Sequence, residues 1–337
     1  MKKIIIASIL IALSFIAGYF LSVKLNKIPE ENILLGFKKP DKTLERYTIE
    51  NLTSTDIKTG SFNIGTEIIK KDEFTTYLFR FRFIPDVTGN IYKTTSGVIN
   101  IPDNEEIKHP IVLLVRGYVD QNIYTSGMGS KNIGEYLASE GFITVAPDFL
   151  GYGDSDSEAT NIFESRFQTY VTVLSLLKTI EGSAINSWDG KNIFIWGHSN
   201  GGQIALTTLE VSGGNYPTVL WAPVSKPFPY SVLYYTDESE DHGKLIRSQL
   251  SKFESFYNVE KYSLTNYIDK INAPIQLHQG TADDAVPMSW SNLLSKNLKG
   301  SEKEVQYITH PGADHNMQPY WNNAAKQTLD FFVEKLK

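Results

Sequence analysis

Six short apolar runs after Pro110 constrain the fold of this chain more than any other feature. They are IVLLV at 111–115, FITVA at 142–146, NIFIW at 192–196, TVLWA at 218–222, PIQLH at 274–278 and VQYIT at 305–309. Strands that are apolar along their whole length are typical of parallel sheets, because helices cover both faces of such sheets. Apolar residues at helical spacing over 163–180 and 322–336 predict two of the covering helices. The alternation of strand and helix patterns predicts a doubly wound, mostly parallel α/β sheet.

Three further segments complete the predicted organisation. Alternating, β-rich residues over 75–84 and 92–101, separated by turn residues, predict a hairpin ahead of the parallel strands. Between 227 and 269 no apolar run occurs and aromatic residues are mixed with charges, which we interpret as an inserted, mostly helical cap. The polar residues 24–56 have no clear period and are interpreted as a tether. The folded domain is therefore expected at 57–337.

The N-terminal residues 4–23 contain no charged side chain and follow Lys2 and Lys3. Twenty apolar residues in a helix reach about 30 Å, which is the thickness of the hydrocarbon core of a bilayer. We expect residues 1–23 to be an uncleaved signal anchor that spans the membrane once and leaves the rest of the chain outside the cytoplasm. The alternative is a cleaved signal peptide, which would give a secreted form.

The composition excludes several classes of protein. The 337 residues include no cysteine, which excludes a disulfide scaffold, a cysteine-ligated metal centre and a lipid anchor on cysteine. The formal net charge of −6, without a long run of Lys or Arg, offers nucleic acid no electrostatic footprint. Nothing in the sequence indicates an obligate protein partner.

The string Gly197-His198-Ser199-Asn200-Gly201 lies between the apolar run at 192–196 and a helical pattern. This is the G-x-S-x-G motif in the strand-to-helix context of a nucleophile elbow. A tight, strained turn exposes the serine hydroxyl, and side chains at 197 and 201 would collide with neighbouring backbone. The sequence therefore predicts Ser199 as a nucleophile, with the amide of Asn200 at the N-terminus of the helix behind it.

A nucleophilic serine needs a base, and the chain order of this motif asks for a histidine after the last strand. His315 lies in a loop there, and His310, which ends the strand itself, is the alternative. The acid that orients the imidazole should follow the preceding strand, where Asp283 and Asp284 are adjacent. Spacing alone does not choose between these two carboxylates.

Four strings carry a resemblance to a known family: VAPDFLGYGDSD, GHSNGG, HQGTADDAVP and PGADH. Together they resemble the α/β-hydrolase fold and, more narrowly, the catalytic domain of the prolyl oligopeptidase family of serine peptidases. The resemblance implies that Asp283, the first Asp of the ADD string, is the acid, with Ser199 as nucleophile and His315 as base. It also places Tyr118, in the string VRGYVD, in the oxyanion hole beside the Asn200 amide, through either its own amide or its hydroxyl. Arg116 stands where hydrolases of this fold commonly have histidine.

The chain departs from that family in having no room for the propeller that restricts substrate size. The predicted cap stands in its place and contains Asp237, Glu238, Glu240 and Asp241, which could hold a substrate cation but which we interpret as a solvated charge run. Tyr234 and Tyr235 could line a substrate pocket or pack the cap against the core.

These patterns predict a membrane-anchored serine hydrolase that forms an acyl-enzyme and needs neither a metal nor an organic cofactor. The favoured substrate is a short peptide, as for a prolyl oligopeptidase-like peptidase. The second hypothesis is a carboxylesterase acting on acylated sugars or other small esters. The third is an inactive binding protein that retains the same fold.

Overall fold

The structure, a computed structural model, describes residues 42–337 except 105, 183–184 and 239–240. The predicted membrane span at 4–23 and residues 24–41 of the predicted tether lie outside this described part. Within the described part, none of the helices combines the length and the apolar character needed to cross a bilayer.

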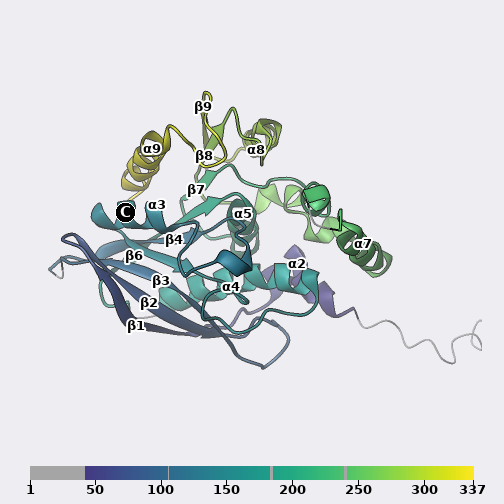
Figure 1. Ribbon diagram of the computed structural model, residues 1–337, viewed down its shortest axis with the longest axis horizontal. Coiled ribbons are helices and arrows are strands. Elements are labelled where there is room, and N and C mark those ends of the chain that lie inside the picture. The colour runs from purple at the N-terminus through teal and green to yellow at the C-terminus, as the bar shows by residue number, and fades with distance from the viewer. Residues whose placement is uncertain (1–41, 105, 183–184, 239–240) are drawn as a thin grey trace, which may run out of the picture. The chain divides into compact units, whose positions relative to one another are not determined.

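The described residues form one nine-stranded sheet in the order β1-β2-β3-β5-β4-β6-β7-β8-β9 (Figure 1). The strands are β1 (Ser61–Lys70), β2 (Phe74–Phe83), β3 (Lys93–Pro102), β4 (His109–Val115), β5 (Ile143–Pro147), β6 (Trp188–His198), β7 (Thr218–Trp221), β8 (Ile275–Gly280) and β9 (Val305–His310). From β5 to β9 all neighbours in the sheet are parallel, whereas β1, β2 and β3 are antiparallel to their neighbours. The predicted α/β architecture with a mostly parallel sheet is confirmed, and each of the six apolar runs is a parallel strand.

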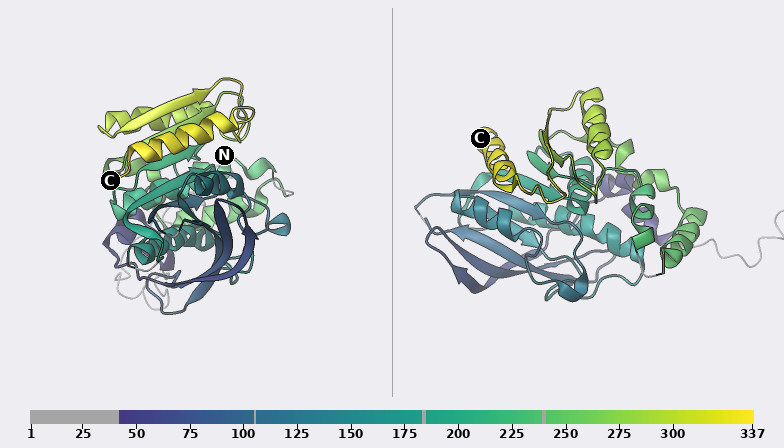
Figure 2. Two further views of the ribbon diagram at one scale, coloured as in Figure 1. Left: turned by 90° about the vertical axis from the view of Figure 1, so that its left-hand side faces the viewer. Right: turned by 45° about the horizontal axis from the view of Figure 1, so that its top comes forward.

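Helices cover both faces of this sheet (Figure 2). Val112 and Leu114 of β4 point into a core shared with α3 (Lys131–Ser139) and α9 (Trp321–Glu334). Leu113 and Val115 point to the other side, into a core shared with α4 (Ile162–Gly182), α5 (Asn200–Ser212) and α8 (Met288–Gly300). Each fully buried aliphatic side chain stabilises the fold by about 1.5–3 kcal/mol relative to its exposed state. Burial on both faces explains why these strands are apolar without alternation.

The predicted hairpin is present, and a third strand extends it. β2 and β3 pair from Phe74 opposite Pro102 to Phe83 opposite Lys93 without a shift in register. β1 then pairs with the free edge of β2. Most residues of β1 are exposed, including Ile64 at 41% and Ile68 at 49%. Because neither face of β1 is buried, its sequence lacks the alternation that identifies a strand, and the sequence analysis missed it.

The interpretation of 24–56 as a tether is wrong for its last part. Thr43–Tyr47 forms the 3-10 helix η2 and Ile49–Ser54 forms α2. Tyr47, Ile49 and Leu52 are each 1% exposed and belong to the core on the α4 side of the sheet. These two short helices bury only a few residues each, so charged neighbours hide the period that a longer amphipathic helix would show.

The segment between β7 and β8 is helical, as expected for 227–269. It contains α6 (Tyr230–Leu233), η4 (Thr236–Glu238), α7 (Lys244–Phe256), η5 (Val259–Tyr262), η6 (Leu264–Asn266) and η7 (Ile268–Lys270). Phe228, Phe253 and Tyr262 pack against Phe163 and Phe167 of α4, with ring centroids 4.9–6.1 Å apart. These aromatic residues therefore anchor the segment to the core.

Glu210 of α5 is a buried carboxyl without a partner. It is 1% exposed, and neither of its carboxyl oxygens has a hydrogen-bond partner among the described residues. Burial raises the pKa of Glu210 well above its ordinary value of 4.5; the nearby charge of Asp269 adds to this effect and Lys270 opposes it. The native protein therefore keeps a proton here that the unfolded chain releases.

Replacing Glu210 by glutamine should increase stability at high pH. The pKa of Glu210 is higher in the folded protein than in the unfolded chain. The unfolding free energy of the wild type therefore falls as the pH rises from about 4.5 toward the folded-state pKa. The slope is about 1.4 kcal/mol per pH unit. We expect the gain in unfolding free energy of Glu210→Gln to be larger at pH 8 than at pH 5. Urea unfolding of both proteins at the two pH values measures it.

The control for this comparison is Glu254→Gln on the exposed surface of α7, which should show no such pH dependence. An equal effect of Glu210→Gln at pH 5 and pH 8 would mean that the Glu210 carboxyl is ionised in the folded protein.

Candidate active site

The register of the parallel strands brings the functional loops together. Val115 at the end of β4 pairs with Gly197 of β6, so the loops that follow Val115 and His198 start side by side. In the same way Gly280 at the end of β8 pairs with His310 at the end of β9. All four loops leave the carboxyl edge of the sheet, where α/β proteins place their ligand sites.

Ser199 lies in a strained turn between β6 and α5, with φ of 56° and ψ of −121°. Its N–H donates to the Trp221 carbonyl at 2.9 Å, and its carbonyl accepts from the N–H of Gly202 and of Val224. A Cβ on Gly201 would lie 1.9 Å from the Val115 carbonyl oxygen. The glycine lets α5 approach the end of β4, and the surrounding hydrogen bonds hold the serine in a conformation that an L residue rarely adopts.

His315 and Asp283 form a hydrogen-bonded pair. His315 Nδ1 lies 2.9 Å from Oδ2 of Asp283 and 3.1 Å from Oδ1. The Asp283 carboxylate is fully buried and also accepts from the N–H of Val286 (2.8 Å), the N–H of Ala285 (3.0 Å) and Nε2 of Gln279 (2.9 Å). Burial alone would raise the pKa of Asp283, but the hydrogen bonds from His315 and Val286 hold it below its ordinary value. The carboxylate is therefore an ionised acceptor for the imidazole.

The two alternatives from the sequence lie elsewhere. Asp284 is exposed and forms no hydrogen bond or ion pair with His315, which pairs with Asp283 instead. His310 is buried, and its Nε2 lies 2.9 Å from Nδ1 of His278, with the two rings stacked. The structure thus brings His315 and Asp283 together and leaves out both Asp284 and His310.

His198 connects the His315 loop to the elbow, a contact that the sequence analysis did not predict. Burial, and next the charge of His315, lowers the pKa of His198 to about 4, so its ring is neutral at pH 7. Its Nε2–H donates to the main-chain carbonyl of His315 at 3.0 Å, and the two ring centroids are 4.7 Å apart. The residue before Ser199 therefore holds the main chain of His315 at the site.

Two amides are placed to serve as oxyanion donors. Asn200 is the first residue of α5, so its N–H has no intrahelical acceptor. Gly117 packs so closely on the elbow that a Cβ there would lie 3.0 Å from Cβ of Ser199. The next residue is Tyr118, whose N–H has no hydrogen-bond partner among the described residues and whose side chain is 75% exposed.

Arg116 fixes the direction of the Tyr118 amide. Its guanidinium is buried, with Tyr152 and Tyr124 at 4.1 and 4.5 Å from its carbon to the ring centroids. It donates to the carbonyl of Gly117 at 2.9 Å and to the main-chain carbonyl of Asp148 at 2.8 Å. Because the Gly117 carbonyl and the Tyr118 N–H belong to one planar peptide and point in opposite directions, holding the first orients the second.

The aromatic residues around Arg116 depend on a second buried group. The Asp148 carboxylate accepts from the hydroxyls of Ser96, Tyr124 and Ser126 at 2.6–2.7 Å and from the N–H of Gly127 at 3.1 Å. Asp148 lies in one of the four strings, but the sequence did not predict a role for it. An aspartate directly after an apolar strand was the available signal.

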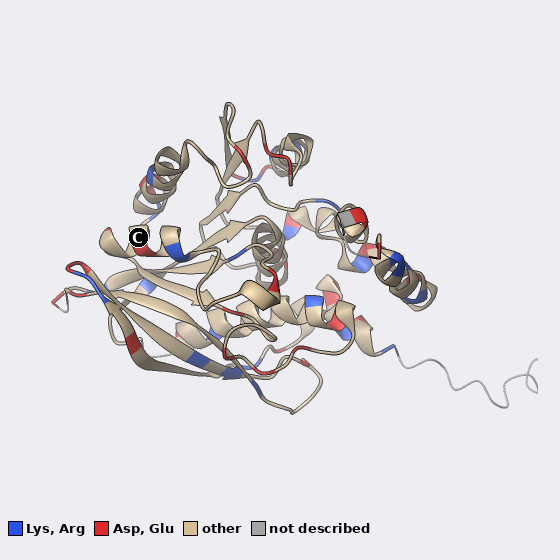
Figure 3. Cartoon of the chain, viewed as in Figure 1, with Lys and Arg blue, Asp and Glu red and all other residues tan. Residues whose placement is uncertain are grey.

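Two acidic residues of the predicted cap, Asp237 and Asp241, are engaged locally. Asp237 forms an ion pair with Arg247 of α7, and Asp241 accepts from the N–H of Gly243 and of Leu245 at the start of that helix. Figure 3 shows the basic residues of α7 beside the acidic ones that precede it. Among the described residues no group of three or more acidic or histidine side chains is arranged to hold a metal ion.

Tyr234 and Tyr235 belong to an aromatic cluster with Tyr230 and Trp290, in which ring centroids are 4.8–6.4 Å apart. The Tyr235 hydroxyl donates to the Ala285 carbonyl at 3.2 Å, which ties this cluster to the loop of Asp283. Tyr230 and Tyr234 are 50% and 39% exposed, so the cluster presents an aromatic surface beside the acid loop.

Comparisons with known proteins identify related sequences and structures. A sequence model described as the prolyl oligopeptidase family matches residues 130–337, which include Ser199, Asp283 and His315. Dipeptidyl peptidase 4 of Sus scrofa is 29% identical over 192 residues, covering 54% of this chain and 23% of that protein. The uncharacterized peptidase YtmA of Bacillus subtilis (strain 168) is 26% identical over 223 residues, covering 63% of this chain and 82% of that protein.

Among solved structures, acetyl xylan esterase 1 from Thermoanaerobacterium sp. JW/SL YS485 has the same fold, with a TM-score of 0.60 and 14% identity. The likeness covers 87% of this chain and 93% of that one. The chain spans about a quarter of the length of the dipeptidyl peptidases that it matches. Since the family match extends over more than half of its residues, this chain belongs to the prolyl oligopeptidase family and is a serine hydrolase with the α/β-hydrolase fold.

Proposed function

We propose that the protein is a serine peptidase that cleaves short peptides through an acyl-enzyme, with Ser199 as nucleophile, His315 as base and Asp283 as acid. The observation that supports this most directly is the His315–Asp283 pair, held at the elbow of Ser199 by the bond from His198 to the His315 carbonyl. Two of the relatives in sequence are named as peptidases, and this supports an amide as the substrate of the present protein.

The chemistry follows from these groups. Ser199 Oγ attacks the scissile carbonyl while Nε2 of His315 takes its proton, and Asp283 stabilises the imidazolium through Nδ1–H. The oxyanion accepts from the N–H groups of Asn200 and Tyr118, where each donor is worth about 3–4 kcal/mol in the transition state. His315 then gives its proton to the departing amine, and water releases the acyl group by the same steps.

The alternative function is a carboxylesterase that acts on acylated sugars or small esters. It uses the same residues, because an ester differs from an amide mainly in having a better leaving group. The fold-level likeness to an esterase over 87% of the chain favours it as the second candidate. The remaining alternative is an inactive protein that binds ligands on this fold.

Two measurements on the full chain test these proposals. A fluorophosphonate probe should label the wild type at Ser199 and should not label Ser199→Ala; no labelling of the wild type would favour the inactive alternative. A panel of short peptides and p-nitrophenyl acyl esters then separates the two activities. Cleavage of esters without cleavage of any peptide would exclude the peptidase and leave the esterase.

Tyr118→Phe distinguishes the two donors that Tyr118 could supply. The side chain of Tyr118 is exposed and the Gly117–Tyr118 peptide is held in one orientation, which favours the main-chain N–H of Tyr118 over its hydroxyl as the oxyanion donor. We therefore expect kcat/KM of Tyr118→Phe to stay within about threefold of the wild type, since the variant keeps the amide. A loss of about 100-fold or more, measured on the best substrate of the panel, would assign the oxyanion contact to the hydroxyl.

We further propose that residues 4–23 anchor the protein in a membrane as a single span, with the catalytic domain outside the cytoplasm. The proposal rests on the length of this uncharged segment and the two lysines before it. The full chain should stay with membranes after alkaline carbonate extraction, whereas residues 24–337 expressed alone should not. Release of the full chain by carbonate, at its unprocessed mass, would contradict the anchor.

A further inference from the structure

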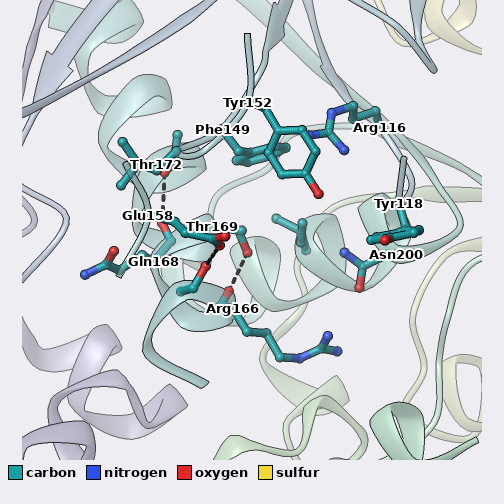
Figure 4. Close-up of a pocket in the computed structure, with 13 residues that line it drawn as sticks. Arg116, Tyr118, Phe149, Tyr152, Glu158, Arg166, Gln168, Thr169, Thr172 and Asn200 are labelled. Carbon is teal, nitrogen blue, oxygen red and sulfur yellow. Dashed lines mark hydrogen bonds between the residues drawn. The ribbon is translucent and has the colours of Figure 1, made fainter. Parts of the chain in front are cut away.

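A cavity of about 120 Å³ lies beside the elbow, on the side of the proposed oxyanion donors (Figure 4). Tyr118 and Asn200 form one part of its wall. The loop after β5, with Phe149 and Tyr152, forms a second part, and α4 contributes the third. The cavity is therefore continuous with the place where the carbonyl of a substrate would be held.

Arg166 of α4 contributes a guanidinium to this cavity with most of its hydrogen-bonding capacity unused. The side chain is half-buried, and Figure 4 shows it extending toward the side on which Asn200 and Tyr118 lie. One terminal nitrogen donates to the neutral Oε1 of Gln203, while Nε is buried and has no partner among residues that the structure describes. No carboxylate in the described part of the chain forms an ion pair with Arg166. A guanidinium in this state is suited to a carboxylate, which it can bind with two parallel hydrogen bonds.

The other charged residues of the wall have partners within the protein. Arg116 donates to two main-chain carbonyls and lies among aromatic rings. Glu158 accepts from Gln121 and from Ser165. These partners are neutral, so the opposite charges of Arg116 and Glu158 remain, and Arg166 adds a second positive charge that makes the lining net positive.

The position of the cavity indicates which part of a substrate enters it. The leaving group must lie at His315, because the imidazole protonates it. The lining of the cavity includes no residue from the loops at 281–287 and 311–317 that carry Asp283 and His315. Its lining includes instead Asn200 and Tyr118, the two proposed oxyanion donors. The cavity thus receives the acyl part of the substrate.

We propose that Arg166 is a specificity-determining residue that pairs with a carboxylate on the acyl part of the substrate. In an ester this is a short dicarboxylic acyl group such as glutaryl or succinyl. In a peptide it is the side chain of Asp or Glu on the N-terminal side of the scissile bond. The assignment rests on the proposed hydrolysis at Ser199.

The test compares two p-nitrophenyl esters of equal chain length, the hydrogen glutarate and the pentanoate, after subtraction of their uncatalysed hydrolysis. Only the glutarate carries the carboxylate. We expect Arg166→Gln to lower kcat/KM for the glutarate by about 10- to 100-fold, the loss typical of a charge-assisted pair, and to change the pentanoate by less than about threefold. Arg166→Lys should recover part of the loss, and Arg80→Gln on the exposed surface of β2 should change neither substrate.

The outcomes separate this inference from the proposed function. An equal loss on both esters, with Ser199 still labelled by the fluorophosphonate, would overturn the role of Arg166 and leave the triad intact. An unchanged glutarate rate in Arg166→Gln would overturn it as well. Absence of labelling in the wild type would instead show that hydrolysis at Ser199 is wrong. A preference for the glutarate that weakens with added salt and disappears in Arg166→Gln would support the assignment.

Discussion

Asp283→Asn is expected to lower kcat/KM by about 10⁴-fold, the loss typical of a triad whose acid has lost its charge. The buried carboxylate accepts from Nδ1 of His315, from two backbone N–H groups and from Gln279. An amide in its place can present only one oxygen, so its NH₂ group faces at least one of these donors. The imidazole then loses either its orientation or the tautomer in which Nε2 is the base. Steady-state kinetics on the best ester of the panel measure the loss.

Asp284→Asn is the matched control, because it makes the same change one residue later on an exposed side chain. We expect its kcat/KM to stay within about threefold of the wild type. Both variants should keep the unfolding midpoint well above the assay temperature, so that activity and not folding is compared. Full activity in Asp283→Asn together with a large loss in Asp284→Asn would reverse the assignment of the acid.

The sequence predicted the parallel part of the sheet, because strands that are buried on both faces are apolar along their whole length. It could not predict β1, whose residues are exposed on both sides, nor α2, which buries only two residues. In both cases the missing signal is apolar periodicity. β1 is held by its neighbour β2, whereas η2 and α2 are held by contacts with parts of the chain far away in sequence. Tyr47 illustrates this, since its hydroxyl donates to the carbonyl of Pro85 and its ring packs on Phe167.

Some residues of the candidate site could likewise be predicted from the sequence, and others could not. Chain order pointed to Ser199 and His315, because a strand followed by a loop at one sheet edge is a local feature. Local spacing could not choose between Asp283 and Asp284, because the choice depends on which carboxylate faces His315 across 32 residues. The roles of Arg116 and His198 are also set by distant partners, namely the Asp148 carbonyl and the His315 carbonyl. Contacts between residues so far apart in the sequence produce no characteristic spacing, so the sequence does not predict them.

Gly201→Ala is expected to destabilise the protein by about 3 kcal/mol or more, although the same change inside a helix ordinarily stabilises by up to about 1 kcal/mol. The added Cβ would lie 1.9 Å from the carbonyl oxygen of Val115 and 2.5 Å from that of Arg116. Both of these oxygens are backbone atoms at the end of a central strand, so the rotation of a side chain cannot relieve the clash. Either α5 or β4 must move, and the elbow and the oxyanion loop would separate.

Gly182→Ala at the end of α4 is the matched control, because a Cβ there has no neighbour within 4 Å among the described residues outside its own helix turn. It should leave the unfolding free energy unchanged or raise it slightly. Urea unfolding of the three proteins, followed by fluorophosphonate labelling of each at a temperature where it is folded, separates the effects on stability and on the site. If Gly201→Ala matched Gly182→Ala in both measurements, the close approach of α5 to β4 would be wrong. The coupling between elbow and oxyanion loop that the Ser199 mechanism requires would then lose its structural basis.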